Sequence, residues 1–158
     1  MKKSFISLLF IGTMAVVLTV GCSKPVKTCT TYTEDNVLAG YSGSHSILNN
    51  TYSFDDSLTI TNPTAGDAKI SIKSEKLGTS LTGTFDANNC GRVTLDSVII
   101  ASQVIESVTL TNIRASGYGV FNGTTLKTVI NIKSGSALIG SLPISLAGQS
   151  LTGTFTKK

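Results

Sequence analysis

Apolar and polar residues alternate with a period of two over most of the chain from Gly40 onward. Successive side chains of a strand point to opposite faces of a sheet, so this alternation predicts half-buried β-strands. We expect about eight to ten short strands with little room for helix. The apolar members of the alternating runs are Leu58 and Ile60, Ile70 and Ile72, Val93 and Leu95, Val108 and Leu110, Leu126 to Ile132, and Leu142 to Leu146.

Residues that favour tight turns separate these runs. Asn122-Gly123 lies between 118–121 and 124–133 and predicts a type I′ hairpin. Pro143 cannot donate a backbone hydrogen bond, so its strand is expected at a sheet edge or at a bulge. The connections are short, and sequential antiparallel neighbours are therefore the simplest topology.

One hexapeptide, SLTGTF, occurs twice without change, as Ser80–Phe85 and as Ser150–Phe155. Leu, Gly and Phe of each copy share one face of the predicted strand, and a glycine between two inward hydrophobic residues permits close backbone approach or a sharp bend. Two equivalent strands of one meander are the simpler interpretation, and a paired ligand-lining element is the alternative.

The start of the chain is organised as an export signal. Lys2 and Lys3 precede an apolar stretch of 16 residues, Phe5–Val20, which is short for a transmembrane helix and typical of a signal peptide. Its end, Leu18-Thr19-Val20-Gly21-Cys22, resembles the bacterial lipobox in the looser form of Bacteroidota-type lipoproteins, with the Leu displaced by one position. The resemblance implies that residues 1–21 are removed and that Cys22 carries lipid. An ordinary signal peptide is the alternative.

Acyl chains such as palmitate on Cys22 would hold the protein on a membrane, because each buried methylene contributes about 0.8 kcal/mol. Residues 22–37 are predicted to be the lipidated N-terminus and a polar tether, and 38–158 to be one β domain. Lys24 follows the anchor and no acidic cluster does. Acidic clusters there resemble the surface-export signal of Bacteroidota lipoproteins, so we expect the periplasmic face of the outer membrane.

Charge and motifs exclude several function classes. The chain has 13 Lys and Arg, and removal of Lys2 and Lys3 leaves 11 against 9 Asp and Glu. These charges are scattered singly, which argues against a nucleic-acid partner. No phosphate-binding loop, dinucleotide fingerprint or metalloprotease motif occurs in the sequence, so we expect no cofactor and no metal.

Two cysteines remain once Cys22 is assigned to lipid. Cys29 and Cys90 form an even pair in an oxidising compartment and predict a disulfide. The bond would close a loop of about 60 residues, for which chain entropy gives roughly 4 kcal/mol. A reactive thiol is the alternative. A zinc site is not favoured, because two thiolates without histidine partners do not fill one.

The many short strands, together with Gly40-Tyr41-Ser42-Gly43 and the two SLTGTF segments, resemble small calycin-like (lipocalin-like) lipoproteins over residues 38–156. The resemblance implies an all-β fold, an antiparallel meander closed into a barrel, with an open β-sandwich as the alternative. The G-x-W signature of lipocalins is missing, because the chain has no Trp. An eight-stranded barrel either holds one small ligand or is packed solid.

Three polar segments are candidates for chemistry. His45 is the only histidine and lies in a Ser/Gly segment that reads as a solvated loop. Asp55-Asp56 resembles a carboxylate pair, but adjacent residues of a strand point to opposite faces. A turn before the next strand is therefore the favoured interpretation. Ser57 and Ser97 each follow an Asp and precede an apolar residue. This pattern resembles the O-glycosylation site of Bacteroidota and would place the modified serine on the surface; a chance match is the alternative.

The sequence therefore favours a non-catalytic, membrane-anchored envelope lipoprotein that binds a small apolar ligand or serves a structural role. The candidate ligand-lining residues, which are also candidates for plain core, are Leu81, Phe85, Leu126, Ile130, Leu151 and Phe155. An alternative is docking on another envelope protein through an edge strand or exposed patch. A third is a hydrolase that depends on His45, although the chain has no G-x-S-x-G nucleophile motif.

Overall fold

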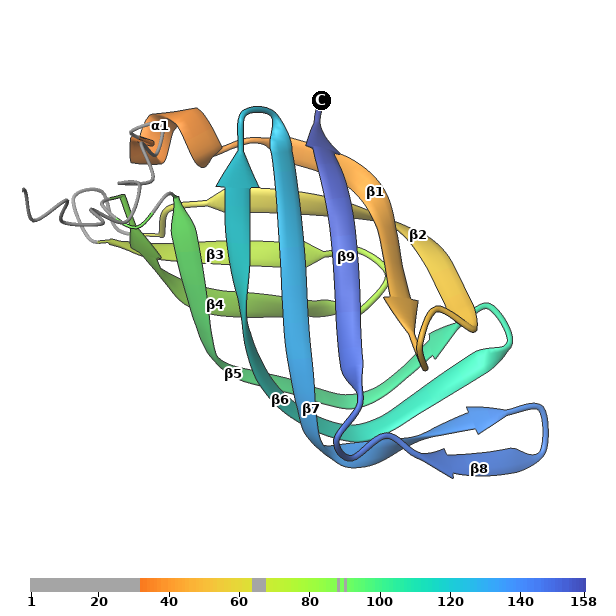
Figure 1. Ribbon diagram of the computed structural model, residues 1–158. Coiled ribbons are helices and arrows are strands. Elements are labelled where there is room, and N and C mark those ends of the chain that lie inside the picture. The colour runs from red at the N-terminus through yellow and green to blue at the C-terminus, as the bar shows by residue number, and fades with distance from the viewer. Residues whose placement is uncertain (1–31, 64–67, 88, 90) are drawn as a thin grey trace, which may run out of the picture.

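The computed structural model describes residues 32–63, 68–87, 89 and 91–158 (Figure 1). The predicted export signal, the lipidation site Cys22 and both predicted disulfide partners, Cys29 and Cys90, lie outside the described residues.

The described chain is almost entirely β-structure, as predicted. One short helix, α1 (Glu34–Val37), precedes nine strands within the described ranges. The strands are β1 (Gly40–Ile47), β2 (Tyr52–Thr61), β3 (Lys69–Ser74), β4 (Thr79–Asp86), β5 (Arg92–Ile105), β6 (Val108–Asn122), β7 (Thr125–Ile139), β8 (Leu142–Ser145) and β9 (Ser150–Lys157).

Eight of these strands close into an antiparallel barrel. Strands β1 to β6 pair in sequence order, β6 pairs with β7, β7 with β9, and β9 returns to β1 (Figure 1). This closure confirms the predicted meander barrel and excludes the open sandwich. Strand β8 pairs only with the end of β7, from Ser136 to Ile139. Pro143 therefore lies on an edge strand, where its missing N–H costs no ladder hydrogen bond.

The two SLTGTF copies form β4 and β9, and three strands separate them in either direction around the barrel. They thus lie on opposite sides of the interior. In both copies the Leu and Phe side chains are buried, and the Thr residues between them are exposed. The repeat consists of two equivalent strands of one meander.

The hairpin predicted near Asn122 is present, but its type differs from the prediction. The ladder continues through the pair Asn122 and Thr125, so Gly123 and Thr124 form the loop. Gly123 has a φ of 61°, whereas Thr124 is not among the residues with positive φ. A positive φ at the first loop position alone is the type II′ pattern.

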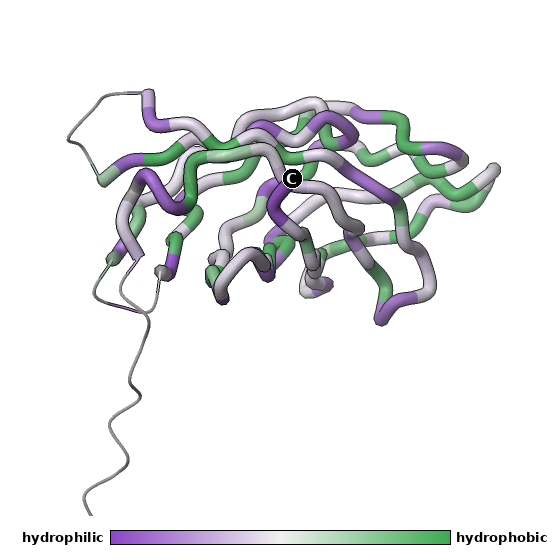
Figure 2. Tube along the Cα trace, turned by 90° about the horizontal axis from the view of Figure 1, so that it is seen from above, coloured by the Kyte–Doolittle hydropathy of each residue, from purple (hydrophilic) through white to green (hydrophobic). Residues whose placement is uncertain are grey.

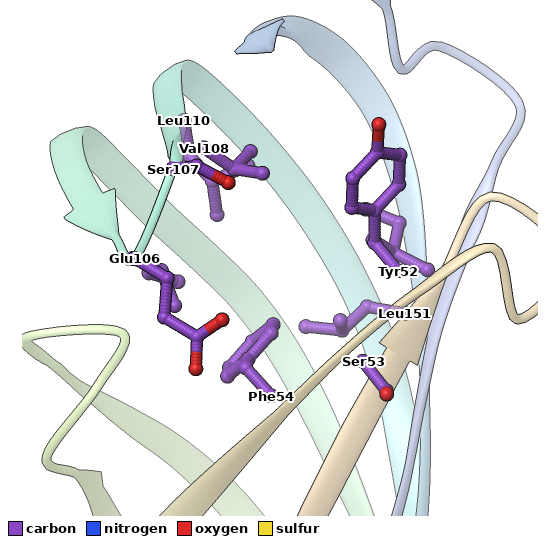
Figure 3. A pocket seen from close by; sticks show the side chains of 10 residues that line it. Tyr52, Ser53, Phe54, Glu106, Ser107, Val108, Leu110 and Leu151 are labelled. Atoms are coloured by element: carbon purple, nitrogen blue, oxygen red, sulfur yellow. The ribbon is translucent and has the colours of Figure 1, made fainter. Parts of the chain in front are cut away.

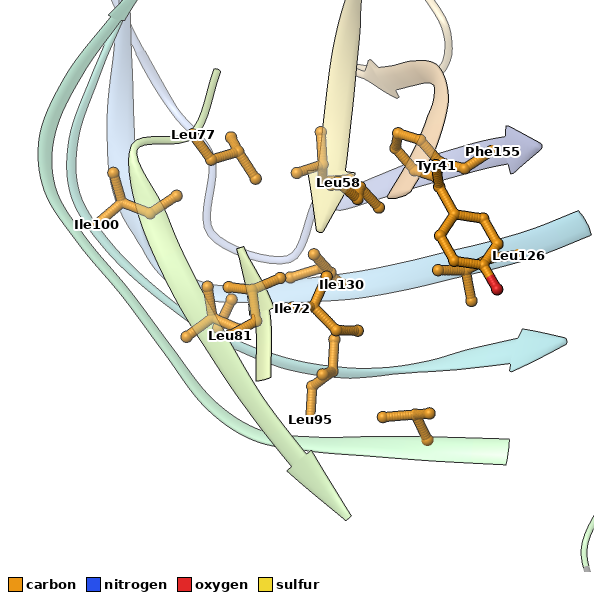
Figure 4. Packing of buried hydrophobic residues seen from close by; sticks show 14 of the residues in the cluster. Tyr41, Leu58, Ile72, Leu77, Leu81, Leu95, Ile100, Leu126, Ile130 and Phe155 are labelled. Carbon is orange, nitrogen blue, oxygen red and sulfur yellow. The ribbon is translucent and has the colours of Figure 1, made fainter. Parts of the chain in front are cut away.

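Alternating side chains fill the barrel. Hydrophobic and hydrophilic residues alternate along the strands in Figure 2, and the inward set converges on one core in Figure 4. Tyr41, Leu126 and Phe155 are among its fully buried side chains, each with at most 1% exposure. Side chains of a strand alternate between its two faces, so a single pairing register places all the apolar side chains of that strand inside the barrel. Among the described residues, no helix is long and apolar enough to span a bilayer.

Candidate functional site

The two ends of the barrel differ. One end is covered by the segment that contains Tyr32 and α1 and leads into β1. The Tyr32 ring lies 6.3 Å from that of Phe121, and the Tyr41 hydroxyl donates a hydrogen bond to the carbonyl of Val37 at 3.1 Å. Burial raises the pKa of Tyr41, and the electrostatic effect of the neighbouring Tyr32 side chain raises it further. The predicted tether through residue 37 is thus folded against the barrel from Tyr32 onward.

The physical reason for this difference is that the segment buries Tyr32 and Val37 in the hydrophobic core, with Leu38 and Ala39 packed against it. Tyr32 and Val37 are 7% and 1% exposed. They show no periodicity in the sequence, so a pattern-based reading could not distinguish their segment from a polar tether.

The opposite end carries an apolar recess. It lies between the turn that joins β1 to β2 and the turn that joins β5 to β6 (Figure 3). Its lining residues are Ile47, Tyr52, Ser53, Phe54, Ile105, Glu106, Ser107, Val108, Leu110 and Leu151. The empty space is about 410 Å³ including the part open to solvent, but the centre of a water molecule can occupy only about 40 Å³ of it. The recess therefore admits a narrow group rather than a ligand of several hundred Å³.

Both lips of this recess hold residues in an unfavourable backbone conformation. Leu48, Asn49 and Asn50 have φ values of 55°, 53° and 67°, and Glu106 on the facing turn has 54°. Only one other non-glycine residue of the described ranges, Asn112, has a positive φ. For Leu48 and Glu106 this strain costs of order 1 kcal/mol or more, and strained residues cluster at ligand clamps and moving segments. Asparagine adopts this conformation more readily.

The six predicted ligand-lining residues fall into two groups. Leu151 borders the recess. The other five pack in the hydrophobic core with exposures of 5% or less, away from the recess; they are Leu81, Phe85, Leu126, Ile130 and Phe155. The SLTGTF repeat thus contributes one residue to the recess and otherwise fills the barrel.

A buried polar cluster lies inside the wall formed by β1, β2 and β3. His45 and Asp56 are 1% and 5% exposed, so the predictions of a solvated loop around His45 and a turn at Asp56 were wrong. His45 Nε2 lies 3.1 Å from Asp56 Oδ2, and Ser74 Oγ donates to the same oxygen at 2.5 Å. The backbone N–H groups of Ser57 and Lys76 donate to Oδ1 at 2.8 and 2.9 Å.

The alternation of β1 and β2 explains why these polar groups are inside. His45 occupies an inward position between Gly43 and Ile47, and Asp56 lies between Phe54 and Leu58. Both strands continue through the segments that the Ser, Gly and Asp content had assigned to loops, because each residue there finds a ladder partner. Asp55, the outward neighbour, is exposed. The two carboxylates therefore point to opposite faces of the strand and do not form a pair.

Burial raises the pKa of Asp56, but the hydrogen bonds from His45, Ser74 and the Lys76 N–H outweigh burial and hold this pKa below its ordinary value. An ionised carboxylate only accepts hydrogen bonds, so the Nε2 of His45 carries the shared proton. His45 Nδ1 and Thr128 Oγ1 are buried without a partner among the described residues. Gly153 leaves the space between them, since a Cβ there would lie 3.0 Å from Nδ1 and 2.5 Å from Oγ1.

This cluster is placed to hold strands together rather than to meet a substrate. Its histidine is enclosed by aromatic rings, with Phe54 at 5.2 Å and Phe155 at 4.8 Å between centroids. Ser74 donates its hydrogen bond to the carboxylate and not to the histidine, so the three residues do not form the serine–histidine–aspartate arrangement of a hydrolase triad. Within the described ranges, no three His, Cys, Asp or Glu side chains are grouped to hold a metal ion.

The two predicted glycosylation sites lie in different surroundings. Ser97 and its preceding Asp96 are both exposed, at the point where the β4–β5 and β5–β6 registers shift. Ser57 is half-buried, and its preceding Asp56 is inside the barrel. Of the two, Ser97 alone has both its serine and the preceding aspartate on the surface.

Most residues of the recess were missed from sequence. A signal was present, because Glu106-Ser107 separates two alternating runs as a short hairpin loop would. The sequence pattern contains nothing, however, that brings this loop close to Tyr52. Comparison with known proteins finds no matching family model, no matching curated protein and no matching solved structure.

Proposed function

We propose that this domain binds a small apolar group at the open end of its barrel, as the folded part of a non-catalytic lipoprotein held on the outer membrane through Cys22. The observation that carries the proposal is the apolar recess between the β1–β2 and β5–β6 turns. Seven of its ten lining residues are hydrophobic, in a barrel whose other end is closed. The strained turns on both lips support it, because they offer a segment that can move when a ligand enters.

The position of the predicted anchor agrees with this role. Cys22 precedes Tyr32 by ten residues, and ten residues span at most roughly 36 Å. Tyr32 packs at the closed end, so lipid on Cys22 would hold that end near the membrane. The recess would then face away from the bilayer, toward the periplasm if the protein is on the inner leaflet.

The proposal is tested with the neutral probe 1-hexanol. The full-length chain in lipid nanodiscs, with labelled Ile, Leu and Val methyl groups, is titrated and followed by methyl NMR. We expect saturable shifts at Ile105, Leu110 and Leu151 and none at Ile70, which is buried in the core away from the recess. Val108→Trp should fill the recess and abolish the shifts.

The matched control is Val104→Trp on the same hairpin, because Val104 is 64% exposed and outside the recess. Shifts that persist in Val108→Trp, or that fail to saturate in the unchanged protein, would contradict binding at this site.

A second candidate function, docking on another envelope protein, has its own observation in favour. Strand β8 has a free edge, and Val104, Leu138 and Leu142 nearby are 64%, 42% and 64% exposed. A photo-crosslinking amino acid at Leu138 should capture one defined envelope protein, and the same group at exposed Asp55 should not. Equal or no capture at both positions would count against this candidate.

A further inference from the structure

The recess carries one charge. Of its ten lining residues, Glu106 is the only ionisable one that is charged at neutral pH. It lies at the turn between β5 and β6, and in Figure 3 its carboxylate is directed from that turn toward Phe54. The side chain is exposed, so its carboxylate lies in water at the rim. A ligand whose tail enters the recess must place its head group close to this carboxylate.

The facing lip contributes two aromatic rings. Tyr52 and Phe54 extend from β2 on the other side of the recess (Figure 3). The face of an aromatic ring attracts an organic cation, and an ammonium group donates strong hydrogen bonds to a carboxylate. Deeper in the recess, Leu110 and Leu151 offer only hydrocarbon and are 5% and 4% exposed. The site thus combines an apolar floor with an anionic, aromatic rim.

The geometry points to a small amphiphilic cation, an alkylammonium compound, as the ligand class of this recess. The alkyl chain packs against Leu110 and Leu151, and the ammonium group lies at the rim beside Glu106. This inference rests on the proposed function and deepens it by naming the head group. An anionic amphiphile such as a fatty acid would place its carboxylate against that of Glu106, and the like charges repel.

Three probes with the same six-carbon chain separate the contribution of the head group from that of the tail. Hexylammonium, 1-hexanol and hexanoate are titrated against the full-length chain in neutral phosphatidylcholine nanodiscs, with the methyl shifts of Leu110 and Leu151 as readout and empty nanodiscs as the blank. We expect hexylammonium to bind about three- to thirtyfold more tightly than 1-hexanol, the combined range of an exposed ion pair and a cation–π contact. Hexanoate should bind most weakly.

The variant Glu106→Gln keeps the shape of the turn and removes the charge. It should lower the preference for hexylammonium over 1-hexanol by up to about fivefold, the contribution of an exposed ion pair, and leave the part that the aromatic rings supply, while 1-hexanol binding stays the same. The control is Glu75→Gln, since Glu75 is an exposed carboxylate in the β3–β4 turn outside the recess. This control should keep the full preference.

The outcomes separate the two claims. If all three probes bind equally, or hexanoate binds best, the inferred ligand class is overturned while the proposed apolar site stands. If Glu75→Gln lowers the preference as much as Glu106→Gln does, the effect belongs to overall charge and the inference is again overturned. If no probe shifts the recess methyls, both the inference and the proposed function fail.

Discussion

Replacing Asp56 by alanine should destabilise the fold more than any other loss of a single polar side chain described above. Its carboxylate accepts four hydrogen bonds, two from backbone N–H groups and two from His45 and Ser74. His45 and Ser74 are each 1% exposed, so water cannot replace the lost partner. A buried donor left unpaired costs about 1–3 kcal/mol, and the substitution leaves two such side chains, those of His45 and Ser74. We therefore expect a loss of about 3–5 kcal/mol in the free energy of unfolding.

The measurement is urea unfolding followed by far-UV circular dichroism. With a slope of about 2 kcal/mol per molar urea, a loss of about 4 kcal/mol moves the midpoint by roughly 2 M. Asp55→Ala is the matched control, because Asp55 precedes Asp56 on the same strand and is exposed. It should change the free energy of unfolding by less than about 0.5 kcal/mol. Equal effects of the two substitutions would refute the argument that the buried network stabilises the barrel.

The same network predicts a pH dependence. The pKa of Asp56 is lower in the folded than in the unfolded chain, so its contribution to stability is fully present above the unfolded value of about 3.9. That contribution is lost as the pH falls through the folded pKa. The difference in stability between the unchanged protein and Asp56→Asn should thus shrink as the pH falls below about 4. A difference that grows on acidification would show that the sign is wrong.

Four further predictions concern single positions. Gly43→Ala should lower the free energy of unfolding by about 2 kcal/mol or more, because its Cβ would overlap the Thr154 carbonyl and lie 2.7 Å from Phe155 Cα. Gly40→Ala, whose Cβ would have its nearest atom at 3.7 Å, should be nearly neutral in the same urea titration. Cys29 and Cys90 should resist alkylation until reduced, and reduction should lower the free energy of unfolding by up to about 4 kcal/mol. Tyr32 and Gly91, which are near the two cysteines in sequence, lie against each other. Free thiols in the isolated protein would disprove the bond. Cys22→Ser should abolish incorporation of labelled palmitate and release the chain from membranes, while continued labelling would place the lipid elsewhere. If the protein is O-glycosylated, Ser97→Ala should remove the mass shift and Ser57→Ala should not; the reverse would show that surface presentation of the Asp-Ser pattern does not select the site.

The sequence by itself determined most of the strands and their inward faces, with β1 and the first half of β2 as the exceptions. A period of two in apolar residues describes one side of each strand, and burial of that side is the largest favourable contribution to folding. Leu58, Ile72, Leu95 and Ile130 were therefore placed correctly in the interior. Repeated identity of SLTGTF likewise indicated two equivalent strands, since the same local pattern meets the same half-buried surroundings in β4 and β9.

Only the tertiary structure decided what those strands bring together. His45, Asp56 and Ser74 come from three strands, and each alone reads as a polar loop residue, because desolvation is offset only when all three meet. The recess depends in the same way on segments 54 residues apart, the start of β2 at Tyr52 and the turn at Glu106, which both line it. Strand closure and register determine that contact, and these long-range pairings leave no periodic signal in the residues that they join.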